Sequence, residues 1–288
     1  MNKSYELSEF DIQLRKSWDD KMKNGHFRYH LDKVETKIIP GEKKYVAQLN
    51  VKRATERRPP QNITIVNQPF DDKVFNFTKI KNDEIIFRLE KSADTNVCNG
   101  HMETKDKVRY SIIVRVILNV SPLEYVCFVN FYFPRGFRVG FNSLCAFASV
   151  NHQHLHAYYL EQEIFTEKCP VKHLKGPVYE LDAIPCKGLA FQLYGTTVDQ
   201  LTRDVLKVTE YLQANEIAHN MFMTRGTGFG KDRDKDTVRI YVWPRKKFIG
   251  NRLTYKINCG KLLVQLIHNC MLKIKKQLKI AFLLKEHY

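Results

Sequence analysis

Three histidines at alternate positions, His152, His154 and His156, constrain what this chain folds into more than any other feature. The flanking stretches, residues 147–150 and 157–160, contain the aromatic and β-branched residues typical of a strand. Successive side chains of a strand point to opposite faces, so the three imidazoles are expected in one row of about 13 Å on one face. Imidazole is largely neutral near pH 7 and therefore nucleophilic. The pattern predicts a strand that carries reactive chemistry.

The row of histidines has three interpretations. Neutral imidazoles can attack phosphorus in phosphoryl or nucleotidyl transfer, they can bind a metal ion, or they can be surface residues of an ordinary strand. A catalytic zinc site usually takes a further acidic or histidine ligand from elsewhere in the chain, which weakens the metal interpretation. No matched ligand spacing is found among the other histidines, which are His26, His30, His101, His173, His219, His268 and His287.

The residues around the histidines resemble a known family. Gly140–Leu144 and Phe147–Leu160 are similar to the histidine-triad superfamily, and within it to the GDP-sugar phosphorylases. The resemblance covers residues 8–125 and 134–247, and further motifs of that family follow in the same order. These motifs are Trp18, Gly25–Tyr29, Gln48–Asn50, Arg57–Pro59, Gln68–Asp71, Phe75–Phe77, Asn119–Tyr125 and Val242–Arg245.

The resemblance implies a reaction and a set of site residues. GDP-sugar phosphorylases split a GDP-hexose with inorganic phosphate into GDP and a hexose 1-phosphate, and they need no metal or other cofactor for this step. By analogy, His154 attacks the phosphorus next to the guanosine and forms a covalent guanylyl-histidine. His152 and His156 position the phosphate oxygens or the nucleophile. The Asn142 side chain and the backbone amide of Ser149 stabilise charge on those oxygens.

The third histidine of the triad bears on the choice of sugar. Plant GDP-L-galactose phosphorylases tend to have glutamine there, so His156 favours the animal type of enzyme, with GDP-glucose and inorganic phosphate as its small-molecule substrates. The general acid for the leaving group is not identified. Arg245 either meets phosphate or the sugar, or is a solvated cation.

The patterns along the chain predict an α+β fold. The resemblance makes it histidine-triad (HIT)-like, a mostly antiparallel sheet with flanking helices. Ser8 is expected to cap a first helix with apolar residues at every fourth position, and Asp199–Asn215 is expected to form another. The glycine-rich stretch Arg225–Lys231 lacks phosphate-loop spacing and is expected as a hairpin turn. Besides the triad strand, strands are expected over residues 43–50, 61–67, 112–120, 126–133, 189–194, 219–224 and 237–243.

Two departures from the family pattern divide the chain. Residues 1–247 form the phosphorylase-like domain, and residues 248–288 form a divergent tail. Near residues 126–134 a helix-containing segment of the relatives is missing, an apparent deletion that leaves part of the sheet uncovered. The rival hypothesis is therefore a catalytically impaired nucleotide-binding relative. A triad metalloenzyme is the remaining alternative.

Positive charge is concentrated in the tail. The chain carries a net charge of +16, and residues 245–288 contain eleven Lys or Arg against one Glu, a net +10. A strongly basic chain suggests nucleic acid or an anionic membrane, but most of the imbalance lies outside the family-like region, so no nucleic-acid partner is expected. Apolar residues four apart predict a basic amphipathic helix. It could dock on the core or, less favoured, lie on a membrane or in a partner groove, or it could be disordered. Its positions are Leu262, Leu266, Cys270, Ile274, Leu278 and Phe282.

The cysteines and the N-terminal residues predict a cytoplasmic protein. The seven cysteines form no C-x-x-C pair and no framework, which suits a reducing compartment. The first residues are polar and lack the apolar core of a signal peptide. No stretch of about 20 apolar residues without charge is present to span a membrane.

Overall fold

The computed structural model describes residues 7–27, 35–49, 56, 58–86, 136–181, 183–248 and 262–264. The strands expected over residues 112–120 and 126–133, the apparent deletion beside them, and most of the tail lie outside the described residues. All five candidate site residues lie inside them.

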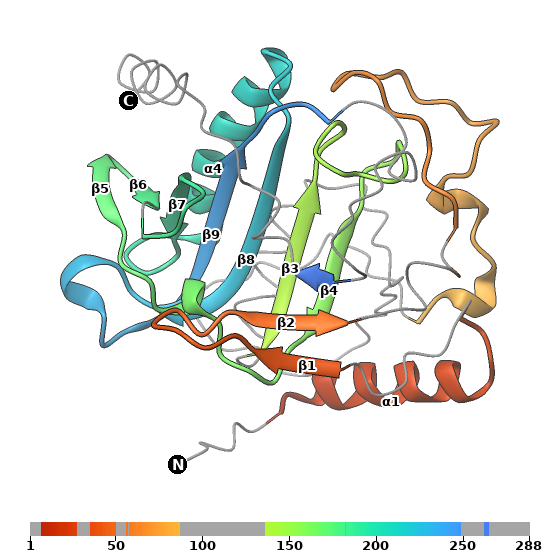
Figure 1. The fold of residues 1–288 in the computed structure, drawn as a ribbon, viewed down its shortest axis with the longest axis horizontal. Coiled ribbons are helices and arrows are strands. Elements are labelled where there is room, and N and C mark those ends of the chain that lie inside the picture. Colours follow the sequence, from red (N-terminus) through yellow and green to blue (C-terminus); the bar gives the residue numbers. More distant parts are fainter. Residues whose placement is uncertain are drawn as a thin grey trace, which may run out of the picture.

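A seven-stranded sheet forms the centre of the molecule, in the order β4-β3-β8-β9-β7-β6-β5 (Figure 1). Every neighbouring pair in it is antiparallel, so the α+β class and the mostly antiparallel sheet expected from the sequence are confirmed. The strands are β3 (Phe137–Asn142), β4 (Leu155–Tyr159), β5 (Lys172–Lys175), β6 (Val178–Leu181), β7 (Gly188–Gln192), β8 (His219–Thr227) and β9 (Asp236–Pro244).

Two helices, α1 (Glu9–Lys23) and α4 (Val198–Ala214), cover one face of this sheet (Figure 1). Both were expected, and both begin at the kind of N-cap that satisfies a free backbone amide. The Ser8 hydroxyl accepts from the Asp11 amide, and the Thr197 hydroxyl accepts from the Gln200 amide. The apolar stripe of α4 and one turn of α1 pack on the sheet to form the main core. Their buried contributions are Leu14, Leu201, Val205, Val208 and Leu212.

A small antiparallel sheet lies over the other face. It consists of β1 (Glu35–Ile38), β2 (Val46–Leu49) and β10 (Leu262–Val264), with β2 in the middle. Val46 packs with Phe222 and Tyr241 of the large sheet in a second core cluster. The prediction of an amphipathic helix from residue 262 is wrong for its first turn, because Leu262–Val264 form a strand that is hydrogen-bonded to β2. The rest of that helix lies outside the described residues.

The paired strands expected near residues 219–224 and 237–243 are confirmed as β8 and β9. Their register continues to Thr227 opposite Asp236, so Arg225–Thr227 belong to β8, and the rest of the glycine-rich stretch, Gly228–Lys231, lies in the hairpin connection that the sequence predicted. The short 3-10 helix η4 (Gly230–Asp232) lies within this connection, and the other short helices are η1 (Phe77–Lys79), η2 (Asn82–Glu84) and η3 (Phe165–Glu167).

The strand expected over residues 61–67 is wrong. Only Ile63 forms an isolated bridge there, and Val66 and Asn67 lie in a turn. The backbone of this segment forms hydrogen bonds with side chains and with loop residues, and not with a neighbouring strand. Thr64 N donates to the Gln68 side chain, and Gln61 N donates to the carbonyl of Ser149. This bond brings the segment to the candidate site.

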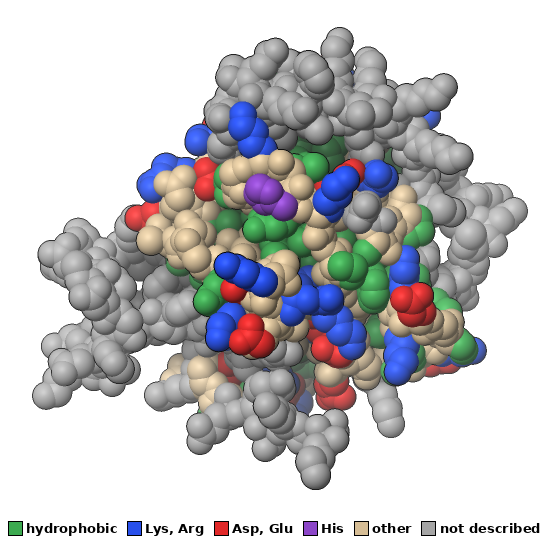
Figure 2. Space-filling view, turned by 90° about the vertical axis from the view of Figure 1, so that its left-hand side faces the viewer, with side chains coloured by type: hydrophobic (Ala, Val, Ile, Leu, Met, Phe, Trp, Pro, Cys, Tyr) green, Lys and Arg blue, Asp and Glu red, His purple; other side chains and the backbone are tan. Residues whose placement is uncertain are grey.

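The charged surface of the described residues is mixed in sign. Figure 2 shows the side of the molecule to the left in Figure 1, where basic and acidic side chains lie next to one another. Several of them form ion pairs, such as Lys187 with Glu180 and Arg225 with Asp236. Within the described residues, no helix is long and apolar enough to cross a membrane.

Candidate active site

The triad segment is a loop that leads into a strand. β4 begins only at Leu155, so of the three histidines only His156 lies in a strand, and the predicted continuous strand with its straight row is wrong. Two features bend the chain before β4. Cys145 and Phe147 adopt left-handed backbone angles, with φ of 57° and 70°, which a strand cannot contain.

The bent loop still brings the three imidazoles together. The ring centroids of His154 and His156 lie 5.0 Å apart in an edge-on arrangement. The ring of Phe77, from η1, lies 4.8 Å from His154 and 5.6 Å from His152. The site is therefore a compact cluster around Phe77, with His154 buried to 5% exposure.

A backbone carbonyl determines the tautomer of His154. Its Nδ1 lies 2.7 Å from the carbonyl oxygen of His152, and a carbonyl can only accept, so Nδ1 carries the proton. In the neutral ring the lone pair is then on Nε2. This is the nitrogen that a nucleophilic histidine would use.

His152 has the opposite tautomer. Its Nδ1 accepts from the backbone N–H of Phe77 at 3.1 Å, so in the neutral ring Nε2 carries the proton. Burial lowers the pKa of His152, which favours this neutral form. The two histidines thus offer different groups, with a lone pair on Nε2 of His154 and a donor on Nε2 of His152.

Asn142 lies at the end of β3, on the same sheet face as His156. Gly140 is the register partner of His156, and Asn142 follows Gly140 by two residues. Asn142 is buried, and its Oδ1 accepts from Asn220 Nδ2 at 2.5 Å, so its own amide nitrogen is the group left to donate elsewhere. Ser149 lies half-buried in the triad loop, where its carbonyl accepts from Gln61 N at 2.9 Å.

Three residues that were not among the predicted site residues hold this arrangement. Gln61 accepts from Asn151 N through Oε1 and donates to the carbonyl of Phe75 through Nε2. Phe77 supplies the amide and the ring against the histidines, and Asn220 holds Asn142. The family motif at residues 75–77 was a signal for Phe77, whereas nothing in the sequence pattern marked Gln61 or Asn220 as part of a site.

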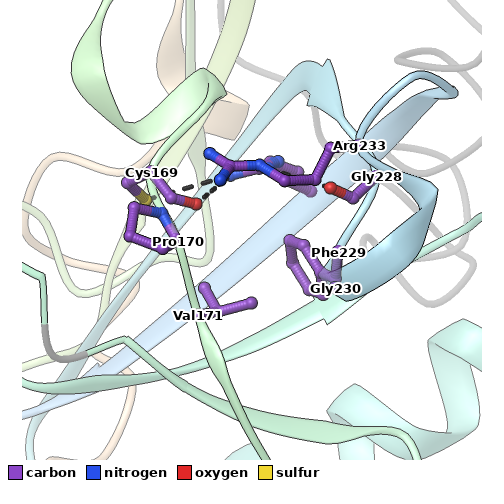
Figure 3. Close-up of a pocket in the computed structure, with 8 residues that line it drawn as sticks. Cys169, Pro170, Val171, Gly228, Phe229, Gly230 and Arg233 are labelled. Carbon is purple, nitrogen blue, oxygen red and sulfur yellow. Dashed lines mark hydrogen bonds between the residues drawn. The ribbon is translucent and has the colours of Figure 1, made fainter.

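A small pocket lies at the far end of the β8–β9 hairpin from the triad (Figure 3). Cys169, Pro170 and Val171 form one side of it, and Gly228, Phe229, Gly230 and Arg233 form the other. The buried guanidinium of Arg239 donates to carbonyls of its neighbours here, including those of Thr166 and Cys169. These hydrogen bonds explain why the charged side chain of Arg239 can be buried in the core. No group of three possible metal-binding His, Cys, Asp or Glu side chains occurs in the described part of the chain, the triad included.

Comparison with known proteins places this chain in a family. A family model described as "GDPGP1-like, N-terminal domain" matches residues 9–135, and "GDPGP1-like, C-terminal domain" matches residues 160–259. GDP-D-glucose phosphorylase 1 of Danio rerio is 39% identical, over 84% of this chain and 75% of the relative. The chain belongs to the GDP-D-glucose phosphorylase family.

Two further relatives show how far the similarity extends. GDP-D-glucose phosphorylase 1 of Xenopus laevis is 33% identical over 92% of this chain and 85% of its own length. That alignment spans 339 positions, more than the 288 residues of this chain, so the frog protein has residues with no counterpart here. GDP-L-galactose phosphorylase 1 of Arabidopsis thaliana is 33% identical over 72% of this chain and 53% of its own length. No solved structure matches.

Proposed function

We propose that this chain is a GDP-D-glucose phosphorylase that works through a covalent guanylyl-histidine on His154. The observation that carries the proposal is the bond from His154 Nδ1 to the His152 carbonyl, which leaves the lone pair of the neutral ring on Nε2. Members of the family named for GDP-D-glucose cover more of this chain than the plant protein named for GDP-L-galactose. GDP-glucose and inorganic phosphate are accordingly the proposed substrates.

The proposed reaction takes two displacements. Nε2 of His154 attacks the phosphorus next to the guanosine, and the bond from that phosphorus to the bridging oxygen breaks, releasing glucose 1-phosphate. An oxygen of inorganic phosphate then attacks the same phosphorus, the bond to Nε2 breaks, and GDP leaves. Covalent catalysis replaces one difficult displacement by two easier ones.

The neighbouring groups would stabilise the charge on the phosphoryl oxygens in both steps. The Asn142 amide and the backbone N–H of Ser149 act as donors to these oxygens. The Nε2–H of His152 is a third donor, since its Nδ1 is occupied by the Phe77 amide. His156, with its ring 5.0 Å from that of His154, positions the nucleophile.

Replacement of His154 tests the nucleophile. His154→Ala should abolish phosphate-dependent release of GDP and glucose 1-phosphate, while far-UV circular dichroism shows a retained fold. His173→Ala is the matched control, because His173 is exposed on β5, where its Nε2 donates to the Gly176 carbonyl and its ring contacts Tyr179, away from the triad. Unchanged turnover in His154→Ala would refute the mechanism. In the wild-type enzyme, incubation with GDP-glucose alone should add a guanylyl mass to the tryptic peptide that contains His154.

A catalytically impaired relative is the second candidate, favoured by the frog residues that have no counterpart here. It predicts GDP binding in calorimetry without phosphate-dependent release of GDP. A metalloenzyme is the third candidate, and it requires stoichiometric zinc, iron or copper in the purified chain. Turnover in the presence of a chelator would remove it.

We also propose a fold type, domain bounds and a cellular compartment that agree with this function. The fold is of the histidine-triad type, supported by the triad at the start of a strand in an antiparallel sheet. The catalytic domain comprises residues 1–247, and residues 248–288 form a divergent tail, of which Leu262–Val264 pair with β2. The reaction takes place in the cytoplasm, in keeping with the free cysteines Cys145, Cys169 and Cys186 among the described residues.

A further inference from the structure

Asn142 is the last member of a chain of three polar side chains that begins at Arg245. Arg245 Nη1 donates to Asn220 Oδ1 at 2.6 Å. Asn220 Nδ2 in turn donates to Asn142 Oδ1 at 2.5 Å and to the carbonyl of Ala146 at 2.9 Å. The proposed reaction uses only Asn142, so the other two residues need an explanation.

The strand register places these side chains next to one another. Asn142 and Asn220 are partners across β3 and β8. Arg245 N donates to the carbonyl of Ala218, which extends the β8–β9 pairing by one step and sets Arg245 diagonally across from Asn220. Asn142 and Asn220 are only 9% and 2% exposed. Water is therefore a poor substitute for their protein partners.

Arg245 and the Ala146 carbonyl together fix the direction of the hydrogen bonds among these three side chains. A side-chain amide can present its oxygen or its nitrogen to a neighbour, and its partners decide which. A guanidinium only donates and keeps its charge at all accessible pH values. The Ala146 carbonyl only accepts, so Asn220 must turn its oxygen to Arg245 and its nitrogen to Ala146 and Asn142. Asn142 must then turn its oxygen to Asn220, which leaves its nitrogen for the site.

The position of Arg245 is itself held. Its guanidinium carbon lies 4.5 Å from the ring centroid of Phe147, a cation–π contact. Phe147 stacks on Phe248 with centroids 4.7 Å apart. Phe147 has a left-handed backbone conformation in the turn before the triad, and its ring lies against the Arg245 guanidinium.

We propose that Arg245 and Asn220 are positioning residues that set the polarity of the Asn142 amide. They make Asn142 present a hydrogen-bond donor to the transferred phosphoryl group, since the reverse orientation would turn an amide oxygen toward an anion. The inference rests on the proposed function, and it assigns a role to two residues that do not themselves contact the substrate.

Asn220→Asp is the decisive variant. A carboxylate keeps the bond from Arg245 but cannot donate, so Asn142 must turn its nitrogen to Asp and its oxygen to the phosphoryl group. We expect kcat for phosphorolysis to fall about 10²-fold or more, the usual effect of losing one such donor, with a smaller change in KM. Asn220→Ala should lose less, because it leaves Asn142 able to rotate. The aspartate oxygen would also face the Ala146 carbonyl, so thermal unfolding of Asn220→Asp measures the structural cost, and a loss of kcat in the folded variant is the result that supports the role of Asn142.

Arg245 offers a second, independent pair of variants. Arg245→Lys still only donates and should retain more kcat than Arg245→Gln, which can present either group, while the Ala146 carbonyl holds Asn220 Nδ2 in both variants. The matched control is Arg233→Gln, an exposed arginine at the far end of the β8–β9 hairpin that bonds to the Lys168 carbonyl. If Asn220→Asp does not fold, as judged by thermal unfolding, this pair decides.

Combination with Asn142→Ala tests whether Arg245 and Asn220 act on kcat through Asn142, as a hydrogen-bond relay, or affect kcat in some other way. Once the Asn142 side chain is absent, Asn220→Asp should cause no further loss of kcat, and additive losses would overturn the relay. Equal or higher kcat in Asn220→Asp than in Asn220→Ala would also overturn it. Wild type and His154→Ala are assayed beside these variants, so failure of the proposed function is seen separately. If wild type binds GDP without turnover, GDP affinity by calorimetry should follow the same order of variants, and a different order would refute the relay.

Discussion

At the scale of single residues, burial keeps two histidines of this molecule neutral. Burial lowers the pKa of His219 to about 4, and the bond from its Nδ1 to the Ile217 carbonyl offsets this only in part. Burial also lowers the pKa of His152. In both residues the charged form would have to give up its hydration, so the unfolded chain takes up protons before the folded protein does.

This difference predicts that stability falls in mild acid. A histidine in the unfolded chain has a pKa of about 6.5. His219 therefore contributes its full stability above that value and loses it progressively as the pH falls toward 4. At pH 5 the loss is about 2 kcal/mol. Urea unfolding at pH 7 and pH 5 should show it, and His219→Gln should reduce the difference while the exposed His173→Gln should not. An unchanged pH dependence in His219→Gln would contradict the assignment.

At the scale of elements, residues 58–80 act as a clamp on the triad loop. Gln61 bonds to Ser149 and Asn151 of the loop, and the Asn151 side chain donates to the carbonyls of Gln68 and Pro69. The Phe77 amide binds His152. A segment about 75 to 90 positions away in the sequence therefore sets the loop that a local strand pattern failed to predict.

Gln61→Glu tests this clamp, because it keeps the acceptor for Asn151 N and removes the donor to the Phe75 carbonyl. The unpaired carbonyl then faces a carboxylate, and we expect a loss of about 1–3 kcal/mol in the free energy of unfolding. Turnover should fall more than stability alone explains, since His152 and His154 lose their support. Gln13→Glu, on the exposed side of α1, makes the same chemical change away from the triad loop and is the control for the added charge. Wild-type turnover in Gln61→Glu would show that the clamp does not govern the site.

Caps, apolar spacing and turn residues predicted the elements whose hydrogen bonds are local. They failed where the backbone is hydrogen-bonded to segments far away in the sequence. Ser8 and the apolar spacing identified α1 and α4, and the glycine-rich stretch identified the β8–β9 hairpin. The strand expected through residues 147–154 is absent, because Gln61 and a left-handed turn hold that backbone. Leu262 looked helical by its spacing, yet it pairs with Leu49. The triad histidines came from the sequence, whereas their tautomers and the Arg245 relay depend on bonds that only the fold creates.

At the scale of the whole molecule, one buried ion pair ties the triad sheet to the loop that covers it. Arg138 on β3 meets Glu167 in η3, with 2.7 Å between Nη2 and Oε1 and side chains 1% and 8% exposed. Glu167 also accepts from the Thr224 hydroxyl on β8 and from the backbone amide of Ile164. Arg138 donates in addition to the carbonyls of Leu160 and Gln162. All groups of the pair are thus satisfied inside the core.

Removing one partner of this pair should be far more harmful than removing both. Glu167→Ala leaves a buried guanidinium without its counter-charge, and we expect a loss of about 3–5 kcal/mol in the free energy of unfolding. The double variant Arg138→Met with Glu167→Leu removes both charges and keeps most of the volume, so it should recover part of that loss, while the Leu160 carbonyl and the Ile164 amide still lose their partners. Denaturant unfolding of the three proteins measures the difference. Because the pair joins β3, β8 and η3, the single variant should still unfold in one transition, and a separate early transition of residues 160–170 would show that this loop is stabilised independently of the sheet.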